Sequence, residues 1–204
     1  MTLWYAVLDT MTSTLQVHPP PSGGEHRFTV EDFYNMVPAG LLEEDSRVEL
    51  LEGHVIPMAP IGPEHHWILR DLLEAFVIQE HGRFQTEPGR SLPIPYHNVP
   101  EPDLMLCRPG AVNRRKHVRP EGVLLVIEIA DSTLERDLGV KANIYREAKI
   151  PEYWVVDVQH RCLHIFGLVE DLYEKALVSA GKVSPKALPG VEIDVDLLFG
   201  GDEA

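Results

Sequence analysis

The sequence predicts one mixed α/β (α+β) domain, in which helices flank a mixed β-sheet. Short apolar runs with the composition of β-strands recur along the second half of the chain. An amphipathic helical pattern precedes them and another separates two of them, an order that a mixed sheet with flanking helices accommodates. With 204 residues, 44% of them hydrophobic, the chain can bury a substantial core without metal or disulfide staples.

The N-terminal residues are expected to form a tail. Residues 1–24 show no sustained periodicity and end in a run of Pro, Ser and Gly, which favours extended or flexible backbone. We therefore expect a single domain over 25–204, and Met1–Met11 is expected to precede the authentic start. The apolar run within 1–11 is too short to span a membrane and lacks a basic flank, so no membrane association and a cytoplasmic location are expected.

The first half of the domain carries three local signals. Thr29-Val-Glu-Asp32 has the pattern of a capping box and predicts a short helix toward Met36. Residues 47–58 predict a β-hairpin that turns at Glu52-Gly53. Residues 63–80 predict a helix, because leucine and phenylalanine recur at core-facing spacing after a proline suited to the first turn.

Five strand-like runs follow, near residues 91–96, 103–107, 122–130, 152–158 and 161–166. Ser132-Thr-Leu-Glu135 has a capping-box pattern, which predicts a helix between the third and fourth runs, and Pro151 predicts its end. Gln159-His160 predicts a hairpin turn between the last two runs.

Acidic residues within or beside these apolar runs are the candidates for a functional site. Glu128 interrupts the run 122–130 near its end, Asp103 begins another run, and Glu49 lies in the predicted hairpin. Charged side chains seldom enter apolar runs without compensation, and one hard divalent cation compensates several carboxylates at once. Each acid taken alone is equally well explained as an edge-strand or turn residue.

The predicted helix after Glu128 carries a lysine on a regularly spaced face. Asp137, Lys141 and Tyr145 are four residues apart, so all three can point back toward the strand that carries Glu128. An ordinary surface pair of Asp137 and Lys141 is the alternative. His65 and His66 lie near the start of the helix 63–80, and either is a candidate to bind metal or phosphate, against the commoner role of a packed or exposed histidine.

The two cysteines give no sign of a metal site. Cys107 and Cys162 lie in strand-like runs without CxxC spacing, and the histidines other than His65 and His66 show no i, i+4 pairing with an acid that suggests zinc. Buried free thiols in a reducing compartment are expected, and a structural zinc site is not.

The net charge of −14 argues against a nucleic-acid partner, because DNA-binding surfaces are usually basic. One basic cluster weakens that objection. It lies in the connection between the runs 103–107 and 122–130, where we expect it beside the acids and in contact with backbone phosphate; the alternative is a solvated loop that pairs with acids of a second subunit. Its members are Arg108, Arg114, Arg115, Lys116 and Arg119.

Four segments together resemble the Uma family of putative restriction endonucleases, within the PD-(D/E)XK nuclease superfamily. The segments are VELLEGHV, PDLMLC, VIEIADST and KANIYREAKIPEYWVVD, and the resemblance covers roughly residues 28–199. It implies a restriction-endonuclease-like fold. The chain departs from the superfamily pattern at Ala130, where a lysine normally follows the second acid by two residues; the resemblance points to Lys141 as the replacement.

The resemblance implies an endonuclease that hydrolyses DNA phosphodiester bonds with a metal-activated water, using Mg²⁺ or Mn²⁺. Asp103, Glu128 and the Ile129 carbonyl would bind the metal, Glu49 would bind it directly or through water, and Lys141 would stabilise negative charge. A homodimer is expected, because duplex cleavage cuts two strands. Ala130 keeps open a catalytically inactive interaction or nucleic-acid-binding module, and the acidic charge keeps open a hydrolase of small phosphate esters.

Overall fold

A six-stranded mixed sheet forms the centre of the domain, and the predicted fold class, a mixed sheet flanked by helices, is confirmed. The computed structural model describes residues 26–200, so the predicted tail over 1–24 lies outside the described residues. The strand order is β3-β4-β5-β6-β7-β8. Neighbouring strands are antiparallel except for β5 and β6, which run parallel and are joined by a helical crossover. The sheet strands are β3 (Gln85–Pro88), β4 (Leu104–Cys107), β5 (Val123–Ala130), β6 (Glu152–Asp157), β7 (Cys162–Val169) and β8 (Leu172–Val178).

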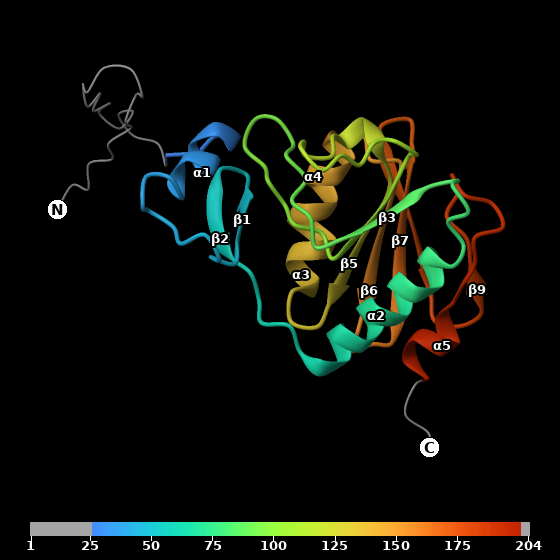
Figure 1. Ribbon diagram of the computed structural model, residues 1–204. Coiled ribbons are helices and arrows are strands. Elements are labelled where there is room, and N and C mark those ends of the chain that lie inside the picture. Colours follow the sequence, from blue (N-terminus) through green and yellow to red (C-terminus); the bar gives the residue numbers. More distant parts are fainter. Residues whose placement is uncertain (1–25, 201–204) are drawn as a thin grey trace.

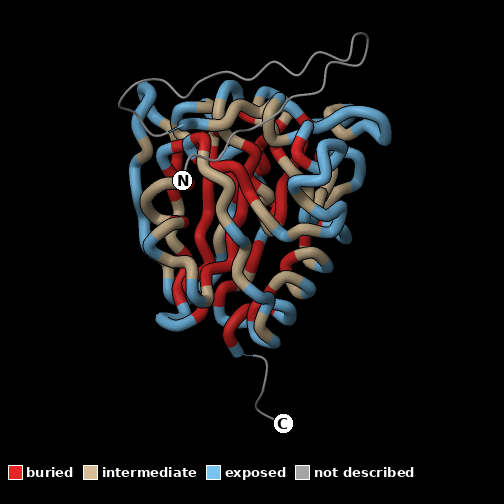
Figure 2. The backbone as a smooth tube through the Cα atoms, turned by 90° about the vertical axis from the view of Figure 1, so that its left-hand side faces the viewer, coloured by how far each residue is buried: buried red, intermediate tan, exposed pale blue. Residues whose placement is uncertain are grey.

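Helices cover both faces of this sheet (Figure 1). On one face, α2 (Pro63–Val77) and α5 (Val195–Phe199) pack against alternate residues of the central strands. On the other face lies the crossover, which consists of α3 (Leu134–Arg136), a π-helical turn η2 (Asp137–Lys141) and α4 (Ala142–Glu147). Every residue of β5 and β6 is therefore buried, and Figure 2 shows the buried backbone concentrated in the middle of the domain.

Smaller elements complete the domain. The predicted helix near Met36 is α1 (Val30–Met36), and its capping box is present: Thr29 Oγ1 accepts from Asp32 N–H at 3.1 Å, and Asp32 accepts from Thr29 N–H at 2.8 Å. The predicted hairpin is also confirmed, as β1 (Val48–Leu51) and β2 (His54–Pro57). The remaining elements are η1 (Pro120–Gly122), β9 (Lys182–Val183) and β10 (Ile193–Asp194).

Two secondary-structure predictions for residues 63–96 are wrong in detail. The run 91–96 contributes only an isolated bridge between Ile94 and Asn98, because Pro93 and Pro95 have no N–H to donate to a sheet. Helix α2 ends at Val77 rather than at residue 80. Within residues 26–200, none of the helices is long and apolar enough to cross a membrane.

Candidate active site

Glu49 reaches the site from the small hairpin rather than from the main sheet. It lies in β1 and is 1% exposed. Backbone hydrogen bonds between Leu50 and Val99 fasten the hairpin to the segment that leads into β4. Within that segment, the Glu101 N–H donates to Glu49 Oε1 at 2.8 Å. The hairpin therefore delivers a buried carboxylate to the start of β4.

Asp103 and Glu128 meet at one end of two neighbouring strands. Asp103 directly precedes β4, and its Oδ2 accepts a hydrogen bond from the Ile129 N–H of β5 at 2.7 Å. Its other oxygen, Oδ1, lies 3.1 Å from Nε2 of His65 in the first turn of α2. Glu128 is 3% exposed and points to the sheet face that the crossover covers. The structure thus brings these two acids to the same pocket.

Lys141 lies between the carboxylates. Its Nζ is 2.8 Å from Glu49 Oε1, 3.0 Å from Glu128 Oε1 and 4.0 Å from Asp137 Oδ1. The Tyr145 hydroxyl donates to the same Glu128 oxygen at 2.8 Å. The prediction that Asp137, Lys141 and Tyr145 face Glu128 is thus confirmed, and the alternative of a surface ion pair is wrong because Lys141 is only 3% exposed.

The crossover begins differently from the prediction. Thr133, not Ser132, is the N-cap residue, and its side chain makes no capping hydrogen bond. The Thr133 hydroxyl instead donates to Asp137 Oδ2. The hydroxyl is therefore used to hold an acid of the site rather than to cap the helix.

These side chains line one pocket, which opens to solvent. All of the predicted metal-binding and catalytic residues line this pocket, and so do His65 and Asp137. Tyr145 does not line the pocket, but its hydroxyl contacts Glu128. Sequence reasoning missed four lining residues that carry charge: Arg47, Glu101, Asp131 and Arg136. Glu101 had a usable signal, because residues two apart in an extended segment share a face, and Asp103 follows it at that spacing.

Burial dominates the electrostatics of the pocket. Burial raises the pKa of Glu128 well above its usual range, against the opposing effect of Lys141. Burial also raises the pKa of Asp137. For Lys141 burial alone would lower the pKa, but Glu128 and Glu49 outweigh it and raise the pKa above its ordinary value. Lys141 is therefore protonated and positively charged. The acidic side chains that line the pocket outnumber its basic side chains.

The basic cluster does not lie beside these acids, and that expectation is wrong. It occupies the connection from Cys107 to Val123, and these two residues pair at the opposite end of β4 and β5 from Asp103 and Glu128. Arg90 holds this loop through hydrogen bonds to the carbonyls of Asn113 and Lys116 at 2.7 and 2.8 Å. Asp103 lies where the chain enters β4, so the loop that follows β4 begins one strand length away from the pocket. The exposed cluster is Arg108, Arg114, Arg115, Lys116 and Arg119.

Known proteins agree with this fold and family. A solved structure of a putative nuclease belonging to DUF820, from Anabaena variabilis ATCC 29413, matches with a TM-score of 0.67 and 13% sequence identity, over 85% of this chain and 98% of that one. No curated protein matches the chain. The family Uma2, described as putative restriction endonuclease, matches residues 30–196. The chain belongs to the Uma2 family of putative restriction endonucleases.

Proposed function

We propose that this chain is an endonuclease that hydrolyses DNA phosphodiester bonds with the help of Mg²⁺ or Mn²⁺. The observation that carries the proposal is the convergence of Glu49, Asp103 and Glu128 on one solvent-open pocket, with the Lys141 ammonium 2.8 and 3.0 Å from two of them. Membership of the Uma2 family supports the reaction class. Ala130 does not weaken the proposal, because Lys141 supplies the ammonium from the crossover.

The donor set fits a hard divalent cation. Asp103, Glu128 and Ile129 line the same pocket and offer carboxylate and carbonyl oxygens, the ligands that Mg²⁺ prefers. Lys141 and Tyr145 both bind Oε1 of Glu128, so Oε2 is the oxygen offered to a metal. Burial is the main cause of the raised pKa of Glu128, and the carboxylates of Asp137, Asp103 and Glu49 raise it further, a negative charge that a bound cation would offset. A bound divalent ion would activate a water for in-line attack and neutralise charge that develops on the phosphate.

Lys141 acts as a hydrogen-bond donor rather than as a base. Its pKa is raised, so the side chain holds its proton throughout the neutral range. Glu49 and Glu128 fix the position of Nζ, and Asp137 adds a third carboxylate at 4.0 Å. A cation held in this way stabilises negative charge in the transition state without having to reorganise.

Arg136 is the side chain best placed to meet the substrate phosphate. It lines the pocket, and its Nε is buried without a hydrogen-bond partner among the described residues. A buried guanidinium donor without an acceptor is costly, and a phosphate oxygen would satisfy it. Arg47 lines the same pocket and adds a second positive charge.

Metal titration and plasmid cleavage on the same samples test the proposal. Calorimetry should show binding of Mg²⁺ or Mn²⁺ by the wild type and its loss in Asp103→Asn. Supercoiled plasmid should be nicked by the wild type only with metal, and neither Asp103→Asn nor Glu128→Gln should cut. Glu135→Gln is the matched control, because Glu135 is an exposed acid on the same crossover.

A wild type that binds no metal and cuts no plasmid would contradict the proposal and favour the interaction module. Cleavage of a small phosphodiester such as bis(p-nitrophenyl) phosphate, without cleavage of plasmid, would assign the pocket to small esters. The expected dimer is tested by sedimentation of the protein with and without a DNA duplex.

A further inference from the structure

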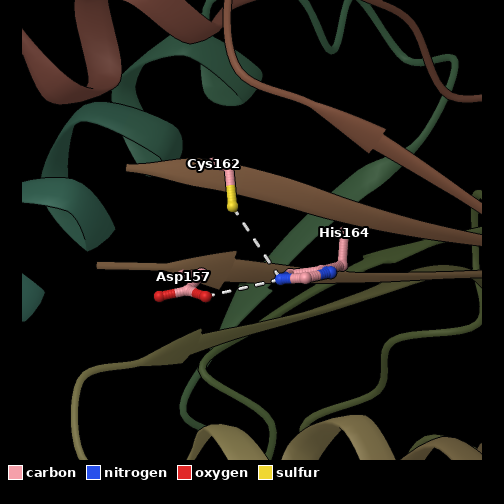
Figure 3. Close-up of side chains that lie close together, drawn as sticks. All are labelled: Asp157, Cys162 and His164. Atoms are coloured by element: carbon pink, nitrogen blue, oxygen red, sulfur yellow. Dashed lines mark hydrogen bonds and ion pairs between the residues drawn. The ribbon is translucent and has the colours of Figure 1, made fainter. Parts of the chain in front are cut away.

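A second group of metal-ligating side chains lies outside the pocket, where β6 turns into β7 (Figure 3). Asp157 is the last residue of β6, Cys162 is the first of β7, and His164 follows two residues later. Asp157 pairs with Cys162 and Val155 pairs with His164, so the antiparallel register places the three side chains on one face of the sheet. Figure 3 shows one nitrogen of the His164 ring facing both the Asp157 carboxylate and the Cys162 sulfur.

The distances suit a tetrahedral ion. His164 Nε2 lies 3.4 Å from Asp157 Oδ2 and 3.9 Å from Cys162 Sγ, and all three ligand atoms lie within 4.8 Å of one another. Zinc bonds of about 2.0 Å to nitrogen or oxygen and about 2.3 Å to sulfur separate tetrahedral ligand atoms by roughly 3.3 to 3.6 Å. The carboxylate and imidazole already have this spacing, and the distance from Sγ to Nε2 would shorten by a few tenths of an ångström.

A turn-capping role accounts for the contacts of Asp157 with the backbone and ring of His160, but not for its contact with His164. Its Oδ1 accepts from the backbone N–H of His160 at 3.0 Å, which closes the hairpin turn. That contact does not explain why His164 Nε2 faces Oδ2 of Asp157. It also does not explain why the Cys162 thiol faces the imidazole of His164. The side chains of Asp157 and His164 are 3% and 12% exposed. Three different ligand types thus share one small, nearly buried volume.

We propose that Asp157, Cys162 and His164 form a site for Zn²⁺ or a similar borderline-soft ion, distinct from the oxygen-lined pocket. Sulfur, nitrogen and oxygen ligands together favour zinc over Mg²⁺, which prefers oxygen. As the metal–sulfur bond forms, the Cys162 thiol releases its proton to solvent. A water would complete the tetrahedron. The exposed His160 ring lies 2.9 Å from Asp157 Oδ2 and holds that carboxylate.

The site would fasten the turn to the proposed active site. Gln159 of the same turn donates from Nε2 to Asp131 Oδ1 at 2.6 Å, and Asp131 lines the catalytic pocket. An ion that holds both ends of the turn would therefore restrain Asp131 through Gln159. This proposal does not depend on nuclease activity, and it replaces the expectation, made from spacing alone, that the chain has no structural zinc site.

Cobalt spectroscopy tests the site directly. The probe is Co²⁺, added to reduced, chelator-treated full-length protein without a histidine tag. We expect one equivalent to bind with a thiolate-to-cobalt charge-transfer band and the visible bands of tetrahedral cobalt, and Zn²⁺ to displace it. Cys162→Ser should abolish the charge-transfer band, and His164→Asn and Asp157→Asn should each weaken binding of Zn²⁺ at least tenfold.

Two controls keep this result separate from the proposed nuclease site. Cys107→Ser, which changes the other buried thiol, and the double variant Asp103→Asn/Glu128→Gln should both retain the full charge-transfer band. Circular dichroism checks that each variant is folded. A wild type without the band, or a Cys162→Ser protein that keeps it, would overturn the proposal, whether or not the protein cuts DNA.

Discussion

The Lys141 ammonium lies 2.8 Å from Glu49 Oε1, in a contact between the crossover helix and a hairpin outside the main sheet. Both side chains are almost fully buried, and the same ammonium contacts Glu128 of β5 at 3.0 Å. One lysine thus joins three structural elements whose residues are far apart in the sequence. Removing Lys141 would leave two buried carboxylates facing each other. The stability of the fold therefore depends on a residue of the candidate site.

A double-mutant cycle on this pair should show strong coupling. Lys141→Met should lower the free energy of unfolding by about 3–5 kcal/mol, because it strands buried charges. Adding Glu49→Gln should recover part of the loss, with a coupling of about 1–3 kcal/mol in urea denaturation with chelator present. The Lys149–Asp171 pair has the same 2.8 Å separation but is exposed, and should show no measurable coupling. Additive effects at Lys141 and Glu49 would contradict the expectation.

Glu128 should make stability pH-dependent in metal-free protein. Because its pKa is raised in the folded state, the folded protein keeps this proton at pH values where the unfolded chain has released it. Stability should therefore fall as pH rises from the ordinary value of 4.5 toward the folded pKa. Tm measured across that range with chelator should fall less steeply for Glu128→Gln than for the wild type. Parallel curves for the two proteins would rule out this source of pH dependence.

His65 is expected to act as a positioning residue for Asp103. Its Nε2 lies 3.1 Å from Asp103 Oδ1, so His65→Ala should free the carboxylate to rotate and weaken Mn²⁺ binding by about 10- to 100-fold. Calorimetric titration measures the change. His66→Ala is the matched control, because His66 is the next residue in the helix and is exposed. Equal losses in the two variants would point to a general effect on α2 instead.

Arg136→Gln should affect DNA cleavage more than metal binding. Removing its unpaired guanidinium donor from the pocket should lower turnover by roughly 100-fold, the usual effect of losing one donor to a developing negative charge. Mn²⁺ affinity should not fall, since Arg136 offers no metal ligand. A loss of Mn²⁺ binding together with cleavage would show that Arg136 supports the site rather than the substrate.

Neutralising the basic cluster should separate binding from turnover. The loop lies at the far end of a strand of four residues, roughly 14 Å away along β4. Arg114→Gln/Arg115→Gln/Lys116→Gln should raise the DNA concentration for half-maximal cleavage several-fold and reduce its salt dependence, with turnover at saturation unchanged. A fall in saturated turnover would mean that the loop reaches the reacting phosphate.

The sequence was informative wherever a charge interrupts an apolar run. Glu128 stands out in the run that becomes β5, and the four-residue spacing of Asp137, Lys141 and Tyr145 predicts their shared face correctly. Such signals are local, and the physical reason for each is visible in the chain itself. The family resemblance supplied the assignment of Lys141 to the same site.

Signals that depend on register between strands were not visible in the sequence. Asp157, Cys162 and His164 meet only because β6 and β7 pair with Asp157 opposite Cys162. The end of the basic loop was misplaced for a related reason: an antiparallel connection carries the chain away from the site before it returns. Pro93 and Pro95 did argue locally against a strand, but the strand prediction for 91–96 gave more weight to the apolar residues beside them.

The π-helical turn Asp137–Lys141 sets the rotational phase of the crossover. A π-turn accommodates one residue more than an α-helical turn, so everything after it is set back by roughly 100° around the helix axis. A rotation of that size moves a side chain from the face that packs on the sheet to the side of the helix at the protein surface. If the same residues wound as a regular α-helix without any deletion, the face that carries Tyr145 would turn by that angle away from Glu128. Deleting a single residue such as Gly139 would instead remove the bulge and leave that face in place.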